Sequence, residues 1–191
     1  MIINIAVEGA SDIGAASSVL RFAGHEVGRV IDKRGKANVD RDVAKYVQAS
    51  RSAPWVVFRD TDAACPVTIS QKLLPHGDIA ASRFQLRLAH SMTEAWLLAD
   101  RRGFATHFQV SRERIPVDPE GVAHAKREVL RLCADSRSRN VREAMVTDEG
   151  EVGPLYVSTI DAFAREHWDV GAAAESSPSL RRAIERIRCM E

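Results

Sequence analysis

The feature that most limits the possible folds is the alternation of short apolar runs with helical stretches in the first half of the chain. The runs are rich in β-branched residues, and the two strongest end in polar turns. Strands that alternate with helices are typical of α/β proteins with a largely parallel sheet. The pattern predicts four strands, over residues 2–7, 25–31, 54–59 and 83–89.

The second half of the chain lacks strand-like runs and carries helical patterns instead. Asp118 followed by Pro119 predicts a helix start, because proline is favoured at the first helical position. Ser177 followed by Pro178 predicts the start of the last helix in the same way. The apolar residues of that helix recur on one face, which indicates a buried face or a seam with a partner helix.

Acidic residues follow two of the predicted strands. Glu8 follows the first strand, and Asp60 and Asp62 follow the strongest one. Loops after parallel strands share one edge of the sheet, where ligands bind, so these carboxylates would converge if their strands are neighbours. Like charges raise one another's pKa, and a divalent cation offsets that cost. Oxygen donors favour Mg²⁺ or Mn²⁺ over zinc, and such ions serve phosphoryl transfer.

Two further acids belong to the candidate set, and each also has an ordinary structural interpretation. Asp12 lies four residues after Glu8, where an acid in the first turn of a helix favours the helix dipole. Glu94 lies early in a helix predicted after the fourth strand. It could form a capping box with Ser91.

Several short motifs resemble the Toprim domain, which occurs in topoisomerases, bacterial primases, recombination proteins and OLD-type nucleases. These are VEG at residues 7–9 and DTD at residues 60–62, within the α/β alternation. EGASD at residues 8–12 is similar to the version in OLD-type and small stand-alone Toprim proteins. MTEAWLLAD at residues 92–100 and IPVDPE at residues 115–120 resemble a stand-alone group.

The resemblance implies a Toprim-like, Rossmannoid three-layer α/β fold with a mostly parallel sheet of about four strands. The Toprim-like core would span residues 1–105, and a helical extension packed on it would span residues 106–191. One or two Mg²⁺ or Mn²⁺ ions are implied. Glu8 would be a metal ligand or the general acid/base, and Lys126 would neutralise charge in the transition state. The implied metal ligands are Glu8, Asp12, Asp60, Asp62 and Glu94.

The activity implied by the resemblance is metal-dependent cleavage of nucleic-acid phosphodiesters, in phage defence or DNA repair. A Walker A motif is absent, so any ATP hydrolysis would come from a partner ATPase. Topoisomerase and primase activities are disfavoured, because the chain lacks the large topoisomerase domains and the zinc module of primases. Arginines 137, 139 and 142 could track a phosphate backbone. Their acidic neighbours favour a solvated face instead. The candidate nucleic-acid-binding residues are Arg137, Arg139 and Arg142.

Two other function classes remain open at this point. The chain could be a non-catalytic Toprim-fold subunit of a larger nucleic-acid-processing complex. It could also be a receiver-like domain with Asp60 as the phosphoacceptor. The usual lysine at the end of the last strand is not evident, since His90 lies there.

Composition narrows the class of protein and the cellular compartment that we expect. Among 191 residues, 27 Lys and Arg face 26 Asp and Glu, which argues against a strongly basic nucleic-acid module. The three cysteines are far apart and predict neither a disulfide framework nor a zinc site. No signal peptide or membrane-spanning run is evident. We therefore expect a cytoplasmic protein with no membrane partner, and a homodimer stays open.

Overall fold

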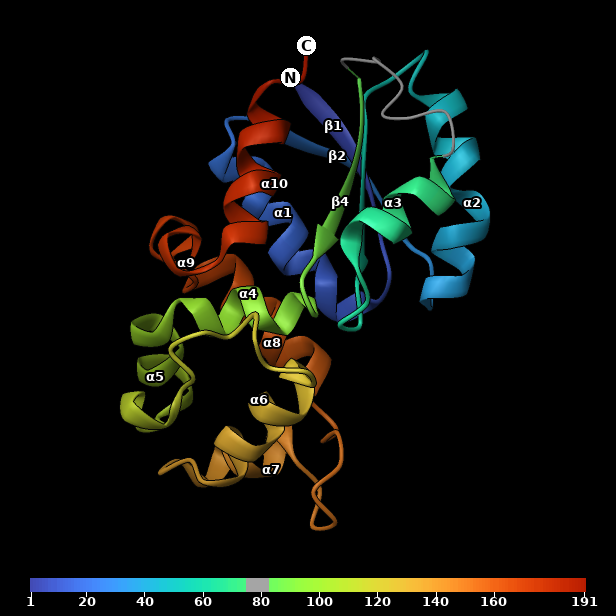
Figure 1. Ribbon diagram of the computed structural model, residues 1–191. Coiled ribbons are helices and arrows are strands. Elements are labelled where there is room, and N and C mark those ends of the chain that lie inside the picture. Colours follow the sequence, from blue (N-terminus) through green and yellow to red (C-terminus); the bar gives the residue numbers. More distant parts are fainter. Residues whose placement is uncertain (75–82) are drawn as a thin grey trace.

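The computed structural model describes residues 1–74 and 83–191. Its centre is a four-stranded, all-parallel sheet in the order β2-β1-β3-β4 (Figure 1). The prediction of an α/β fold with four parallel strands is confirmed, and each predicted strand boundary agrees within one residue. The strands are β1 (Ile2–Val7), β2 (Glu26–Asp32), β3 (Trp55–Asp60) and β4 (Phe84–Ala89).

Helices cover both faces of the sheet, in a three-layer, Rossmann-like arrangement (Figure 1). Helices α2 (Lys36–Ala49) and α3 (Pro66–Leu73) cover one face, and α1 (Ile13–Phe22) and α10 (Pro178–Arg188) cover the other. Side chains alternate across a strand, so β3 sends Val57 to the first face and Phe58 to the second. The central strands are therefore buried on both sides.

The remaining helices gather around the carboxyl ends of the strands and beside α1 (Figure 1). One buried apolar cluster runs from Ile3 in β1 to Ile187 in α10, so the two halves of the chain share a core. These helices are α4 (Thr93–Ala99), α5 (Arg101–Phe108), α6 (Ala125–Ala134), α7 (Arg139–Met145), α8 (Tyr156–Glu166) and α9 (Val170–Ser176), with 3-10 turns at Ala10–Asp12 and Arg112–Arg114.

The predicted start of the last helix is confirmed. The Ser177 side chain accepts a hydrogen bond from the Leu180 amide, and Pro178 is the first helical residue. Ile184 and Ile187 are buried, as the apolar spacing predicted. This helix closes one side of the sheet next to β4 (Figure 1).

Two local predictions were wrong. Asp118 does not begin a helix: its carboxylate accepts from the Gly121 amide at 3.1 Å in a turn, and α6 starts only at Ala125. Ser91 forms no capping box with Glu94, because its hydroxyl donates to the Val122 carbonyl at 2.8 Å. In both cases a local turn or a contact from another segment replaces the helix cap that the short pattern suggested.

Within the described residues, no helix combines the length and the apolar character needed to cross a membrane.

Candidate functional site

The structure brings the predicted acidic residues to one pocket at the carboxyl edge of the sheet. Glu8 follows β1 and Asp60 ends β3, and these strands are neighbours. The pocket has a volume of about 320 Å³. Its lining includes all five candidate metal ligands and the candidate lysine: Glu8, Asp12, Asp60, Asp62, Glu94 and Lys126. The expected convergence of Glu8, Asp60 and Asp62 is therefore observed, and Asp12, Glu94 and Lys126 line the same pocket.

Asp60 is held in place by the start of α4. Its Oδ1 accepts from the Thr93 amide at 2.9 Å and from the Thr93 hydroxyl at 3.0 Å. Burial raises the pKa of Asp60 well above its ordinary value, and the charges of Asp12, Glu94 and Glu8 raise it further. The hydrogen bonds from Thr93 oppose this rise only in part.

Asp12 has a structural and an electrostatic role at once. Its Oδ2 accepts from the Gly9 amide at 2.9 Å and so closes the turn after β1. The side chain is also buried, only 7% exposed. Burial, followed by the charge of Glu94, raises the pKa of Asp12 to about 7. Asp12 therefore both closes the turn after β1 and lines the acidic pocket.

Glu94 is oriented by a tyrosine from a distant helix. The Tyr156 hydroxyl, at the first residue of α8, donates to Glu94 Oε1 at 2.9 Å. Burial and the Glu94 charge raise the pKa of Tyr156, so the phenol stays protonated as the donor. Lys126 Nζ lies 4.8 Å from the centre of the same ring, a cation–π distance. The sequence analysis missed this role of Tyr156, because 62 residues separate it from Glu94.

Glu8 and Asp62 form the more open side of the pocket. Glu8 Oε2 is buried and has no hydrogen-bond partner among the described residues. Burial and then the charge of Asp62 raise the pKa of Glu8. Asp62 is partly exposed and pairs with Lys36 Nζ at 2.6 Å. The unpartnered oxygen of Glu8 is therefore the atom in the pocket most in need of a ligand.

The loop after β2 also lines the pocket, which the sequence analysis did not foresee. Asp32 pairs in register with Val7 at the end of β1, and Asp32, Arg34 and Gly35 all reach the pocket. The signal was present, since a strand was predicted to end there. Asp32 and Arg34 follow that strand just as the predicted acids follow the other strands.

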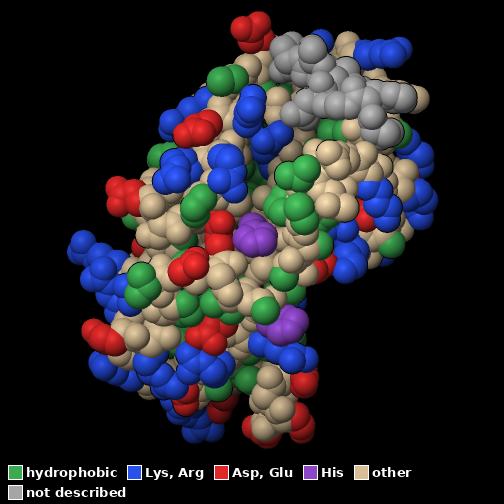
Figure 2. Space-filling view, in the orientation of Figure 1, with side chains coloured by type: hydrophobic (Ala, Val, Ile, Leu, Met, Phe, Trp, Pro, Cys, Tyr) green, Lys and Arg blue, Asp and Glu red, His purple; other side chains and the backbone are tan. Residues whose placement is uncertain are grey.

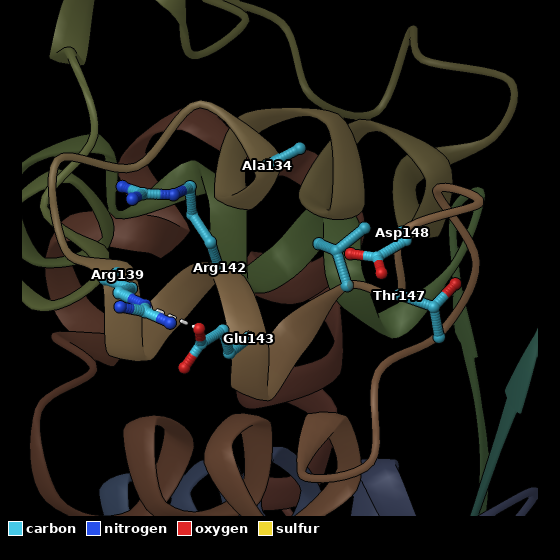
Figure 3. A pocket seen from close by; sticks show the side chains of 7 residues that line it. Ala134, Arg139, Arg142, Glu143, Thr147 and Asp148 are labelled. Atoms are coloured by element: carbon cyan, nitrogen blue, oxygen red, sulfur yellow. Dashed lines mark hydrogen bonds and ion pairs between the residues drawn. The ribbon is translucent and has the colours of Figure 1, made fainter.

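The three candidate nucleic-acid-binding arginines do not line the acidic pocket. Arg139 and Arg142 line a separate pocket of about 320 Å³ beside α7, shown in Figure 3. There Arg139 pairs with Glu143 at 2.6 Å, and Arg142 donates to the Ser136 carbonyl. Arg137 is exposed and lines neither pocket. The structure thus keeps this group apart from the carboxylates.

The donor set of the acidic pocket fits a hard divalent cation in its chemistry, because it offers carboxylate oxygens and one unpartnered buried oxygen. Over residues 1–74 and 83–191, however, no three His, Cys, Asp or Glu side chains form a group that could hold a metal ion as they stand. Comparisons of the chain with protein-family models, with curated proteins and with solved structures found no match. Only the residues of the pocket itself therefore indicate what it could bind.

Proposed function

We propose that the protein is a Mg²⁺- or Mn²⁺-dependent nuclease of the Toprim type. The observation that carries the proposal is the convergence of five carboxylates, from three separate segments, on one pocket. Buried carboxylates that raise one another's pKa destabilise a fold unless a ligand offsets their charge. A bound cation would offset the repulsion between these carboxylates.

The carboxylates of Glu8, Asp12, Asp60, Asp62 and Glu94 would hold one or two ions, and their side chains would have to turn toward one another to do so. Such an ion polarises a phosphate oxygen and lowers the pKa of water.

The chain's own residues have distinct tasks in this proposal. Thr93 fixes the orientation of Asp60, and Tyr156 fixes that of Glu94. The unpartnered Glu8 Oε2 would either hold an ion or accept a proton from the attacking water. Lys126 and Arg34 bring positive charge to the pocket wall, where it attracts the substrate phosphate.

A nuclease assay tests the proposal. Labelled DNA and RNA, single- and double-stranded, are incubated with the protein in Mg²⁺, Mn²⁺ or EDTA. We expect cleavage in either metal, none in EDTA, and none by the Asp60→Ala/Asp62→Ala variant. A folded protein that cleaves nothing with any metal would contradict the proposal and favour a non-catalytic subunit.

By its resemblance to Toprim proteins, we propose a cytoplasmic role for the protein in phage defence or DNA repair, beside a partner ATPase.

Tyr156→Phe tests whether the tyrosine orients Glu94. The substitution removes one hydroxyl and leaves the buried ring in place. Loss of a partner that orients a metal ligand typically lowers metal affinity or activity about 10- to 100-fold. We expect a decrease of that size in cleavage at low Mn²⁺, partly restored at high Mn²⁺. Tyr46→Phe, on α2 and outside the pocket, is the matched control and should cleave like the wild type.

A further inference from the structure

A groove with an unusual charge lies along the outer edge of the sheet. It has a volume of about 280 Å³ and is lined by residues of β4, α3 and α10. Figure 1 shows α10 on one side of β4 and α3 on the other. Among its described lining residues, three are arginines and none is acidic or aromatic. Its lining includes Val67, Leu86, Arg87, Leu88, Arg182 and Arg186.

Two of the three groove arginines have no acidic partner among the described residues. Arg182 and Arg186 are exposed on α10, and neither has a hydrogen bond or ion pair with a described residue. They are four residues apart, so they lie on one helix face about 6 Å apart along the axis. Arg59, by contrast, is neutralised by Asp40 at 2.8 Å. Figure 2 shows basic side chains gathered over α10 on this face.

The groove lies beside the end of β3, the strand that carries Asp60 of the acidic pocket. In the sheet, Leu88 of the groove pairs with Arg59, and the next residue, Ala89, pairs with Asp60. Neighbouring strands are about 4.8 Å apart, so the groove ends close to the strand end that carries Asp60. Ser179 also lines the groove, and its hydroxyl accepts from the His90 amide at 3.3 Å.

We propose that this groove binds the sugar–phosphate backbone of a nucleic-acid strand, and that the same strand continues to the acidic pocket. The proposal rests on the proposed function. Arginine guanidinium groups bind phosphate through paired hydrogen bonds. The described lining offers no aromatic ring for base stacking, so the groove contacts the backbone and binds without sequence preference. An acidic peptide is the competing occupant, and the position beside Asp60 favours the nucleic acid.

The test is binding of fluorescent DNA oligonucleotides, measured by anisotropy in EDTA so that cleavage does not interfere. Arg182→Glu and Arg186→Glu are compared with Arg181→Glu. Arg181 is an exposed neighbour on the same helix that does not line the groove, so its substitution has the same charge change. We expect each groove variant to bind at least about 10-fold more weakly, and Arg181→Glu to stay within about 3-fold of the wild type. Each lost phosphate contact should lower the salt dependence, the slope of log K against log[salt], by about 0.9 for duplex DNA.

The proposal would be overturned by no binding by the wild type, by wild-type affinity in both groove variants, or by an equal loss in Arg181→Glu. Polyglutamate that displaces the oligonucleotide at equal charge concentration would also overturn it, in favour of an acidic peptide. The Asp60→Ala/Asp62→Ala variant should still bind in EDTA. Binding that depends on the groove without any cleavage would support the groove and contradict the nuclease. Metal-dependent cleavage with unchanged binding in the groove variants would support the nuclease and contradict the groove.

Discussion

Replacing Glu8 with glutamine is expected to lower metal-dependent cleavage by more than about 100-fold. Loss of a residue that merely orients a ligand costs about 10- to 100-fold, so loss of a carboxylate that itself contacts the ion or the water should cost more. Glutamine has the same shape but cannot accept a proton at the position of Oε2, the buried oxygen that has no partner. The fold should be retained, since Glu8 forms no ion pair with any residue in the described parts of the chain.

The same variant separates the two roles open to Glu8. If Glu8 is mainly a metal ligand, Glu8→Gln weakens Mn²⁺ binding and high Mn²⁺ restores part of the rate. If Glu8 is mainly the base, Mn²⁺ binding is unchanged and the rate stays low at all concentrations. Glu149→Gln, an exposed residue remote from the pocket lining, serves as the control. Wild-type cleavage by Glu8→Gln would show that Glu8 has no role in catalysis or metal binding.

Replacing Asp12 with asparagine is expected to stabilise the protein at alkaline pH when divalent cations are removed. Burial and Glu94 raise the pKa of Asp12 to about 7, above the ordinary 3.8. The folded state therefore holds this proton more tightly than the unfolded state, and the free energy of unfolding falls as pH rises from about 4 to 7. Asparagine has no charge to bury and can still accept the bond from Gly9 through its side-chain carbonyl. At pH 8 we expect a gain of about 2 to 4 kcal/mol.

Thermal unfolding in EDTA at about pH 4 and pH 8 checks this prediction. The gain corresponds to a rise in Tm of roughly 5 to 10 °C at pH 8 and little change at pH 4. Asp148→Asn, an exposed acid, should leave Tm unchanged at both pH values. Equal Tm values for wild type and Asp12→Asn at pH 8 would show that Asp12 carries no buried charge. Added Mn²⁺ should raise the Tm of the wild type more than that of the variant.

The fold was predictable because it depends on local patterns. The buried positions of β1 are all apolar, and those of β3 are apolar except for Arg59. Parallel strands with crossover helices also have few alternative arrangements. The convergence of Glu8, Asp60 and Asp62 followed from the same rule, since each lies after a strand that ends at one edge. The prediction of this convergence required only the positions of the strand ends and the identity of neighbouring strands.

The rest depended on contacts between distant segments. Tyr156 reaches Glu94 from another helix, and no spacing in the sequence reveals such a bond. The groove arginines belong to a helix whose apolar face was recognised, but its polar face became informative only when α10 lay beside β4. The cap predicted at Asp118 was wrong for the related reason that a turn and a helix start share the same local chemistry.

Mn²⁺ binding to the acidic pocket can be followed by the loss of the free-ion EPR signal as protein is added. We expect saturable binding of one or two ions per chain by the wild type, strongly weakened in Asp60→Ala/Asp62→Ala and unchanged in Asp148→Asn. A folded wild-type protein that leaves the Mn²⁺ signal unchanged would contradict the account, because the five converging carboxylates would then have no cation to hold.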